Sequence, residues 1–220
     1  MPEIFWDKLQ RYLKKDGAEA EQMRLFVSCN MREHITACRH CSLPLYENHT
    51  QKVPGEGSLQ SPMMLIGEGP GFDEDRDGRP FIGKAGQLLT TILDKLEVNR
   101  QRVYITNVIK CRPPENRTPL KSEIDACSKI LELELDIIAP KVVIALGAVP
   151  LKYFKQDGGI IRSRGKWLQS KGIWIMPTYH PAYILRQQGK ALVKAKWDVW
   201  HDFNAAFHKV KELCPDYRFK

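Results

Sequence analysis

The stretch MMLIGEGPG at residues 63–71 joins a short apolar run to a glycine-rich turn, as the end of a buried strand does. Three further apolar runs, rich in β-branched residues, follow at residues 103–108, 142–146 and 173–176. Segments with helical periodicity separate the four runs. This alternation predicts an α/β fold in which parallel strands are connected by crossover helices.

Helix bounds follow from the same pattern. Apolar residues at helical spacing predict two short helices within residues 4–28 and a last helix over residues 190–210. Thr118 followed by Pro119 predicts an N-cap with proline at the first helical position, opening a helix that runs to Ile138. Residues 42–62 contain three prolines and two glycines, which predicts an irregular connection over the surface.

Length and composition indicate one domain, residues 1–220, with N-terminal helices in residues 1–37. The 34 Lys and Arg residues exceed the 26 Asp and Glu residues, and the net charge of +8 favours a polyanionic partner without identifying it. The first thirty residues lack the apolar core of a secretory signal, and no apolar run is long enough to span a bilayer. We therefore expect a cytoplasmic protein without a membrane partner. A monomer is assumed by default, since no feature of the sequence indicates another state.

In an open parallel sheet, ligands bind beyond the carboxyl ends of the strands. This rule selects four loops, at residues 67–83, 107–116, 147–152 and 177–186. The motif-like residues of the sequence fall in these loops. We therefore expect one composite pocket at that edge of the sheet.

Four of the six cysteines suggest a metal or cluster site. Cys38 and Cys41 form a C-x-x-C pair, and fifteen residues separate Cys111 from Cys127. Four thiolates suit a tetrahedral zinc ion or a [4Fe–4S] cluster, and the spacing does not choose between them. A buried free cysteine on the apolar face of its helix is the alternative for Cys127. We interpret the other two cysteines, Cys29 and Cys214, as structural or incidental thiols.

Three motifs accompany the cysteines: GEGPGFDEDRDGRPFIGKAGQLL at residues 67–89, TNVIKCRPPENRTP at residues 106–119 and HPAYILR at residues 180–186. Together with the four cysteines, these motifs resemble the family 4 uracil-DNA glycosylases over residues 38–186. The resemblance implies a DNA-repair enzyme that flips uracil out of single- or double-stranded DNA and hydrolyses its N-glycosidic bond. It also implies a three-layer fold with a central four-stranded parallel sheet flanked by helices, and a [4Fe–4S] cluster on Cys38, Cys41, Cys111 and Cys127, within residues 38–127.

The resemblance makes Phe81 the residue that stacks on the extruded base. The amide of Asn107 offers an acceptor and a donor that match N3–H and O4 of uracil, whereas cytosine presents the reversed pattern. His180 is placed to donate a hydrogen bond to uracil O2 while negative charge spreads over the leaving base. Backbone amides in residues 67–71, among them Gly67, Glu68 and Gly69, can approach the base and the flanking phosphates closely because glycine has no Cβ.

The residue that orients the attacking water is left open. Other branches of the superfamily place an acid or an amide where this chain has Gly69. Glu68, Glu74 and Asn116 are the candidates, and the sequence does not rank them.

Basic residues in the same loops are expected to contact DNA phosphates, namely Lys110, Arg112, Arg117 and Arg186. Leu185 is the first choice for an apolar wedge that fills the gap left by the extruded base, with Tyr183 and Ile184 as neighbours.

Three other functions are weighed against this one. A cluster-bearing binding or electron-transfer protein would release no base. A relative that binds uracil-containing DNA very tightly or covalently is disfavoured because residues 110–114 carry no added basic insertion. A zinc enzyme of nucleotide metabolism would need an H-x-E motif paired with P-C-x-x-C, and the sequence lacks that pair.

Overall fold

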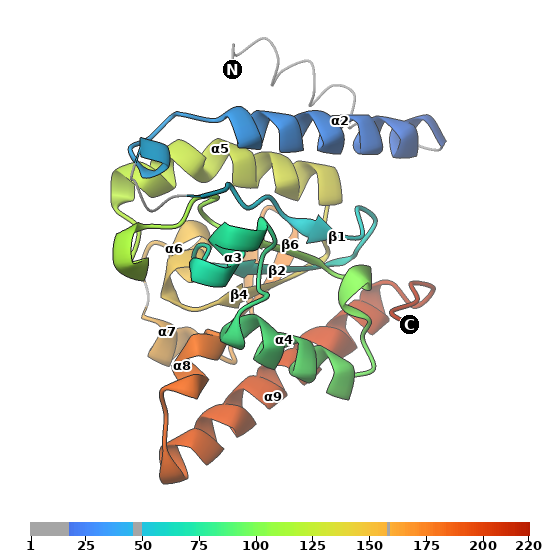
Figure 1. The fold of residues 1–220 in the computed structure, drawn as a ribbon. Helices are drawn as coiled ribbons and strands as arrows, with labels where there is room; N and C mark the ends of the chain where they lie inside the picture. Colours follow the sequence, from blue (N-terminus) through green and yellow to red (C-terminus); the bar gives the residue numbers. More distant parts are fainter. Residues whose placement is uncertain (1–17, 46–49, 158) are drawn as a thin grey trace.

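The computed structural model describes residues 18–45, 50–157 and 159–220. Its centre is a six-stranded sheet with the order β1-β3-β2-β4-β6-β5 (Figure 1). The strands are β1 Glu56–Gly57, β2 Met63–Gly67, β3 Tyr104–Asn107, β4 Val142–Leu146, β5 Leu168–Ser170 and β6 Ile173–Thr178.

The four inner strands β3, β2, β4 and β6 pair in parallel, so the predicted α/β fold with a parallel core is confirmed. The sheet is nevertheless wider than predicted, because β1 and β5 add an antiparallel strand at each edge. Both edge strands are short, and β1 lies inside the segment predicted to be irregular. Strands of two or three residues are too short to show an alternating pattern in a sequence.

Helices cover both faces of the sheet. Figure 1 shows α2 (Ala18–Ala37) and α5 (Lys121–Ile138) on one side, and α4 (Lys84–Lys95) and α9 (Gly189–Leu213) on the other. The short helices are α3 Phe72–Asp77, α6 Ala148–Phe154, α7 Ile160–Ser163 and α8 Pro181–Leu185, with 3-10 turns η1 Leu43–Leu45, η2 Arg100–Arg102 and η3 Pro114–Asn116. None of the described helices is long and apolar enough to cross a membrane.

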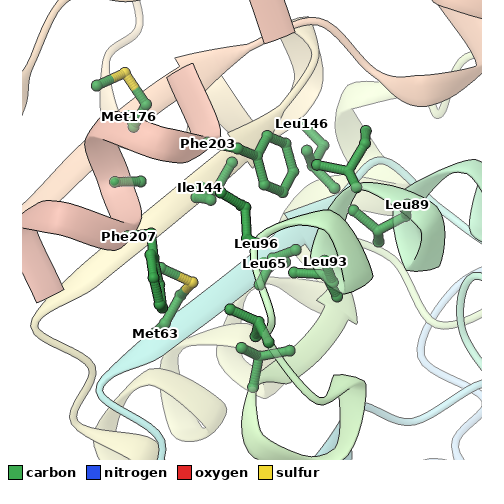
Figure 2. Close-up of a cluster of buried hydrophobic side chains, with 14 of the residues drawn as sticks. Met63, Leu65, Leu89, Leu93, Leu96, Ile144, Leu146, Met176, Phe203 and Phe207 are labelled. Carbon is green, nitrogen blue, oxygen red and sulfur yellow. The ribbon is translucent and has the colours of Figure 1, made fainter. Parts of the chain in front are cut away.

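The inner strands are buried on both faces, which explains their continuous apolar runs. Met63 and Leu65 face α4 and α9, whereas Met64 and Ile66 face α2 and α5. Figure 2 shows the first of these two cores, where Phe203 and Phe207 of α9 and side chains of α4 pack over the strands. Two cores thus hold the strand ends in fixed positions.

Helix starts differ most from the predictions. α5 begins at Lys121 rather than after Thr118, because the Glu123 carboxylate accepts the Leu120 N–H at 2.7 Å and fixes the N-terminus there. The second helix predicted within residues 4–28 is part of α2, which runs on to Ala37. The first lies outside the described residues. Residues 147–152, predicted to be a loop, contain the start of α6.

Candidate functional site

A pocket of about 460 Å³ opens at the carboxyl ends of β2, β3 and β6. Its lining residues come from three segments, 68–85, 107–119 and 180–186. Three of the four predicted loops therefore meet in one pocket. Within the described part of the chain, residues 147–152 contribute nothing to its lining.

Asn107 is the last residue of β3 and is 2% exposed. No described residue offers its Oδ1 atom a hydrogen-bond partner. Its register partner on β2 is Gly67, where a Cβ would collide with both Asn107 Oδ1 and the Phe81 ring. Glycine at this position therefore lets an amide and an aromatic ring approach each other at the strand ends. A buried polar atom without a partner costs free energy, so it is a strong sign of a ligand site.

Phe81 has a backbone φ of 53°, which a bulky residue adopts only under strain, at a cost of about 1–3 kcal/mol. Phe81 is 5% exposed and lines the pocket, and its ring lies 5.6 Å from the His180 ring, centroid to centroid. Phe81 also belongs to the core that includes α4 and α9. The side chain is thus held by the core while its ring forms part of the pocket wall.

Glu74 holds the strained loop in place. Its carboxylate accepts the N–H groups of Ile82 and Gly83, each at 2.9 Å, and that of Gly71 at 3.1 Å. These three bonds close the segment between α3 and α4 around Phe81. Glu74 was a candidate for orienting water, but the structure gives its oxygens backbone partners.

His180 is the N-cap of α8, and its Nδ1 atom accepts the Ala182 N–H at 3.1 Å. Because Nδ1 is an acceptor, the neutral ring carries its proton on Nε2. Burial, followed by the positive charge of Arg186, lowers the pKa of His180 to about 4. The imidazole is therefore neutral near pH 7 and can donate a hydrogen bond from Nε2.

Glu68 lies directly after β2 and lines the same pocket. Burial raises the pKa of its carboxyl group, an effect that the charge of Arg186 opposes. A raised pKa makes the carboxylate a stronger proton acceptor. Among the described residues, no hydrogen bond to this carboxylate is formed.

Asn116 also lines the pocket, and its Oδ1 atom accepts Arg112 Nε at 2.7 Å. Arg117 forms an ion pair with Glu123 at 2.6 Å, so its guanidinium is already engaged by a carboxylate. Leu185 is 50% exposed at the end of α8, as a wedge would have to be. The DNA contacts of these residues stay predictions.

Lys110 does not fit its predicted role as a phosphate contact, because its side chain is 1% exposed. Its ammonium group donates to Glu134, to Thr106 Oγ1 and to the Asn107 backbone carbonyl, each at 2.7 Å. Glu134 belongs to α5 and is fully buried. This network was not predicted, although a lysine between Ile109 and Cys111 in an apolar run is a signal of an internal ion pair.

The four cysteines predicted as ligands lie in neighbouring parts of the fold: Cys38 and Cys41 follow α2, Cys111 follows β3 and Cys127 belongs to α5. Burial raises the pKa of the Cys111 thiol, and the thiols of Cys127, Cys41 and Cys38 raise it further. Burial likewise raises the pKa of Cys127 to about 11, although the Lys110 backbone N–H and ammonium group oppose the shift. Within the described residues, no group of three or more His, Cys, Asp or Glu side chains has an arrangement that could hold a metal ion.

Comparisons with known proteins identify the family of this chain. A family model described as the uracil DNA glycosylase superfamily matches residues 54–204. A type-4 uracil-DNA glycosylase of Thermotoga maritima is 45% identical over 166 residues, 73% of this chain and 84% of that protein. One of Sulfurisphaera tokodaii is 44% identical, covering 70% of this chain and 74% of the relative. One of Archaeoglobus fulgidus is 35% identical, covering 82% and 89%. The chain therefore belongs to the type-4 uracil-DNA glycosylases.

Proposed function

We propose that this protein removes uracil from DNA by hydrolysing the bond between C1′ of the sugar and N1 of the base. The family membership supports this activity. The observation that carries it here is the unpaired Oδ1 atom of Asn107, buried in a pocket beside Phe81 and His180. An extruded uracil would supply the missing partner from its N3–H group.

Base recognition follows from the same three side chains. The Asn107 amide accepts from N3–H and donates to O4, and cytosine, with its acceptor and donor exchanged, would leave buried groups unpaired. The Phe81 ring stacks on the base. His180 Nε2–H donates to O2, where negative charge grows as the C1′–N1 bond breaks. Its neutral state at pH 7 suits this donor, because the reaction needs no proton transfer from the ring.

Water completes the reaction at C1′. We propose Glu68 as the residue that orients it, because the other two candidates, Glu74 and Asn116, already accept hydrogen bonds from the protein. The water oxygen bonds to C1′ and its proton passes to the Glu68 carboxylate, while the uracil anion takes a proton from solvent. The products are free uracil and an abasic site.

We also propose that Cys38, Cys41, Cys111 and Cys127 hold a [4Fe–4S] cluster. Membership of the type-4 family is consistent with it, and the thiols of Cys38, Cys41 and Cys127 are near enough to Cys111 to raise its pKa. Cluster ligation spreads the thiolates over several irons and does not require them around a single ion. The bound cluster would supply a cross-link between α2, the β3 loop and α5, and base release needs no electron from it. The monomeric state and the cytoplasmic location stay predictions from the sequence.

One preparation tests both proposals. The protein is purified anaerobically, its iron content is measured, and it is incubated with end-labelled DNA containing one uracil, followed by alkali. Strand cleavage at uracil, with none in matched thymine or cytosine controls, is expected. A preparation rich in iron that cleaves nothing would favour the binding-protein alternative, whereas zinc with full activity would leave the activity standing and overturn the cluster.

A further inference from the structure

Phe72, the first residue of α3, is 59% exposed although phenylalanine is usually buried. It follows Gly71, which lines the pocket. The guanidinium carbon of Arg112 lies 5.1 Å from the centroid of its ring. An exposed aromatic ring and a guanidinium group therefore lie together at the rim of the pocket. The proposed reaction uses neither the Phe72 ring nor its contact with Arg112.

The pair is fixed to the pocket wall rather than free on the surface. Arg112 Nε donates to Asn116 Oδ1 at 2.7 Å, and both Asn116 and Pro113 line the pocket. The guanidinium is thus held by a pocket residue on one side and by the ring on the other. More than half of the surface of Phe72 is still available to a ligand.

We propose that Phe72 and Arg112 form a stacking site for the nucleobase next to the extruded uracil in the same strand. This inference rests on the proposed function. Aromatic rings stack on any base, because every base has a π-face, and a neighbouring arginine adds a cation–π contribution and attraction to phosphate. The site would hold the strand in register with the pocket without reading its sequence.

Loss of one base-stacking contact of this kind weakens binding by about tenfold. Phe72→Ala is therefore expected to raise KM about tenfold on uracil-containing single strands and to change kcat little, and Phe72→Trp should restore KM. Phe72 lies outside both buried cores, so Phe72→Ala should melt at the wild-type temperature. Phe26→Ala is the matched control, because Phe26 is similarly exposed, at 63%, and belongs to α2, which contributes no residue to the pocket lining.

The decisive comparison uses oligonucleotides in which tetrahydrofuran, which has no base, replaces the neighbour of uracil on the 5′ or on the 3′ side. With the contacted neighbour removed, the wild type and Phe72→Ala should bind equally, as measured by fluorescence anisotropy, and should have the same KM. With both neighbours present, the tenfold difference should return.

The oligonucleotide comparison separates the stacking site from the proposed function. If Phe72→Ala binds as the wild type does on every oligonucleotide, or loses the same amount with and without each neighbouring base, the stacking site is wrong. If the base-dependent difference appears in anisotropy while the wild type releases no uracil, the stacking site stands and the proposed function fails.

Discussion

For Asn107 and His180, the sequence predicts the location of the side chain better than its hydrogen bonding. Their positions at the ends of two apolar runs were enough to predict that both face one pocket, because carboxyl ends of parallel strands share an edge. The unpaired Oδ1 atom of Asn107 depends on neighbours distant in the sequence, and no local pattern encodes it. The Nε2 proton of His180 follows instead from a local contact, the bond from Ala182 N–H at the start of α8.

Asn107→Asp replaces the amide donor by an acceptor that faces uracil O4. We expect kcat/KM for uracil excision to fall at least about a hundredfold, because a site built on hydrogen bonds rejects a mismatched partner. Single-turnover excision assays measure the effect, with a thermal melt to check the fold. Activity within a few-fold of the wild type would remove Asn107 from base recognition.

The pH dependence follows from the lowered pKa of His180. We expect the His180 ring to titrate with a pKa of about 4. Arg186→Gln removes a charge that disfavours the imidazolium, so the midpoint of this titration moves to higher pH. NMR titration of the ring measures both, because kcat also depends on the ionisation of Glu68, whose carboxyl pKa is raised by burial. A wild-type midpoint near pH 6.5 would contradict the neutral-donor role.

At the scale of elements, the strands were predictable and the helix ends were not. Runs buried on both faces give an unbroken apolar signal, so the four inner strands were placed within two residues. The start of α5 depends on the carboxylate of Glu123, which also binds Arg117. The proline at position 119 instead indicated a helix start two residues too early. The tight segment between α3 and α4 likewise depends on Glu74.

Glu74→Ala would leave three backbone N–H groups without their acceptor. We expect the free energy of unfolding to fall by about 2–4 kcal/mol, and uracil excision to slow because the Phe81 loop relaxes. Glu74→Gln keeps one acceptor oxygen and should lose less of both. Urea unfolding and single-turnover rates distinguish the two variants. Equal stability in all three proteins would show that the loop does not need this carboxylate.

At the scale of the whole molecule, the buried pair of Lys110 and Glu134 ties the catalytic edge of the sheet to the α5 layer. Lys110→Met should lower the free energy of unfolding by about 3–5 kcal/mol, because it leaves the Glu134 carboxylate buried without its counter-charge. The double variant with Glu134→Gln removes that charge and should recover much of the loss. Chemical denaturation of both variants measures this. A double variant less stable than the single one would mean that the network acts through packing instead.

Gly67 sets a boundary on how this pocket can evolve. Even a methyl group there would strike the Asn107 side chain and the Phe81 ring at once. Selection for a different damaged base, in nature or in a directed library, therefore meets a barrier at the end of β2 as long as Asn107 and Phe81 are kept. A larger residue at position 67 needs a simultaneous change of these two side chains, so the three positions have to evolve together.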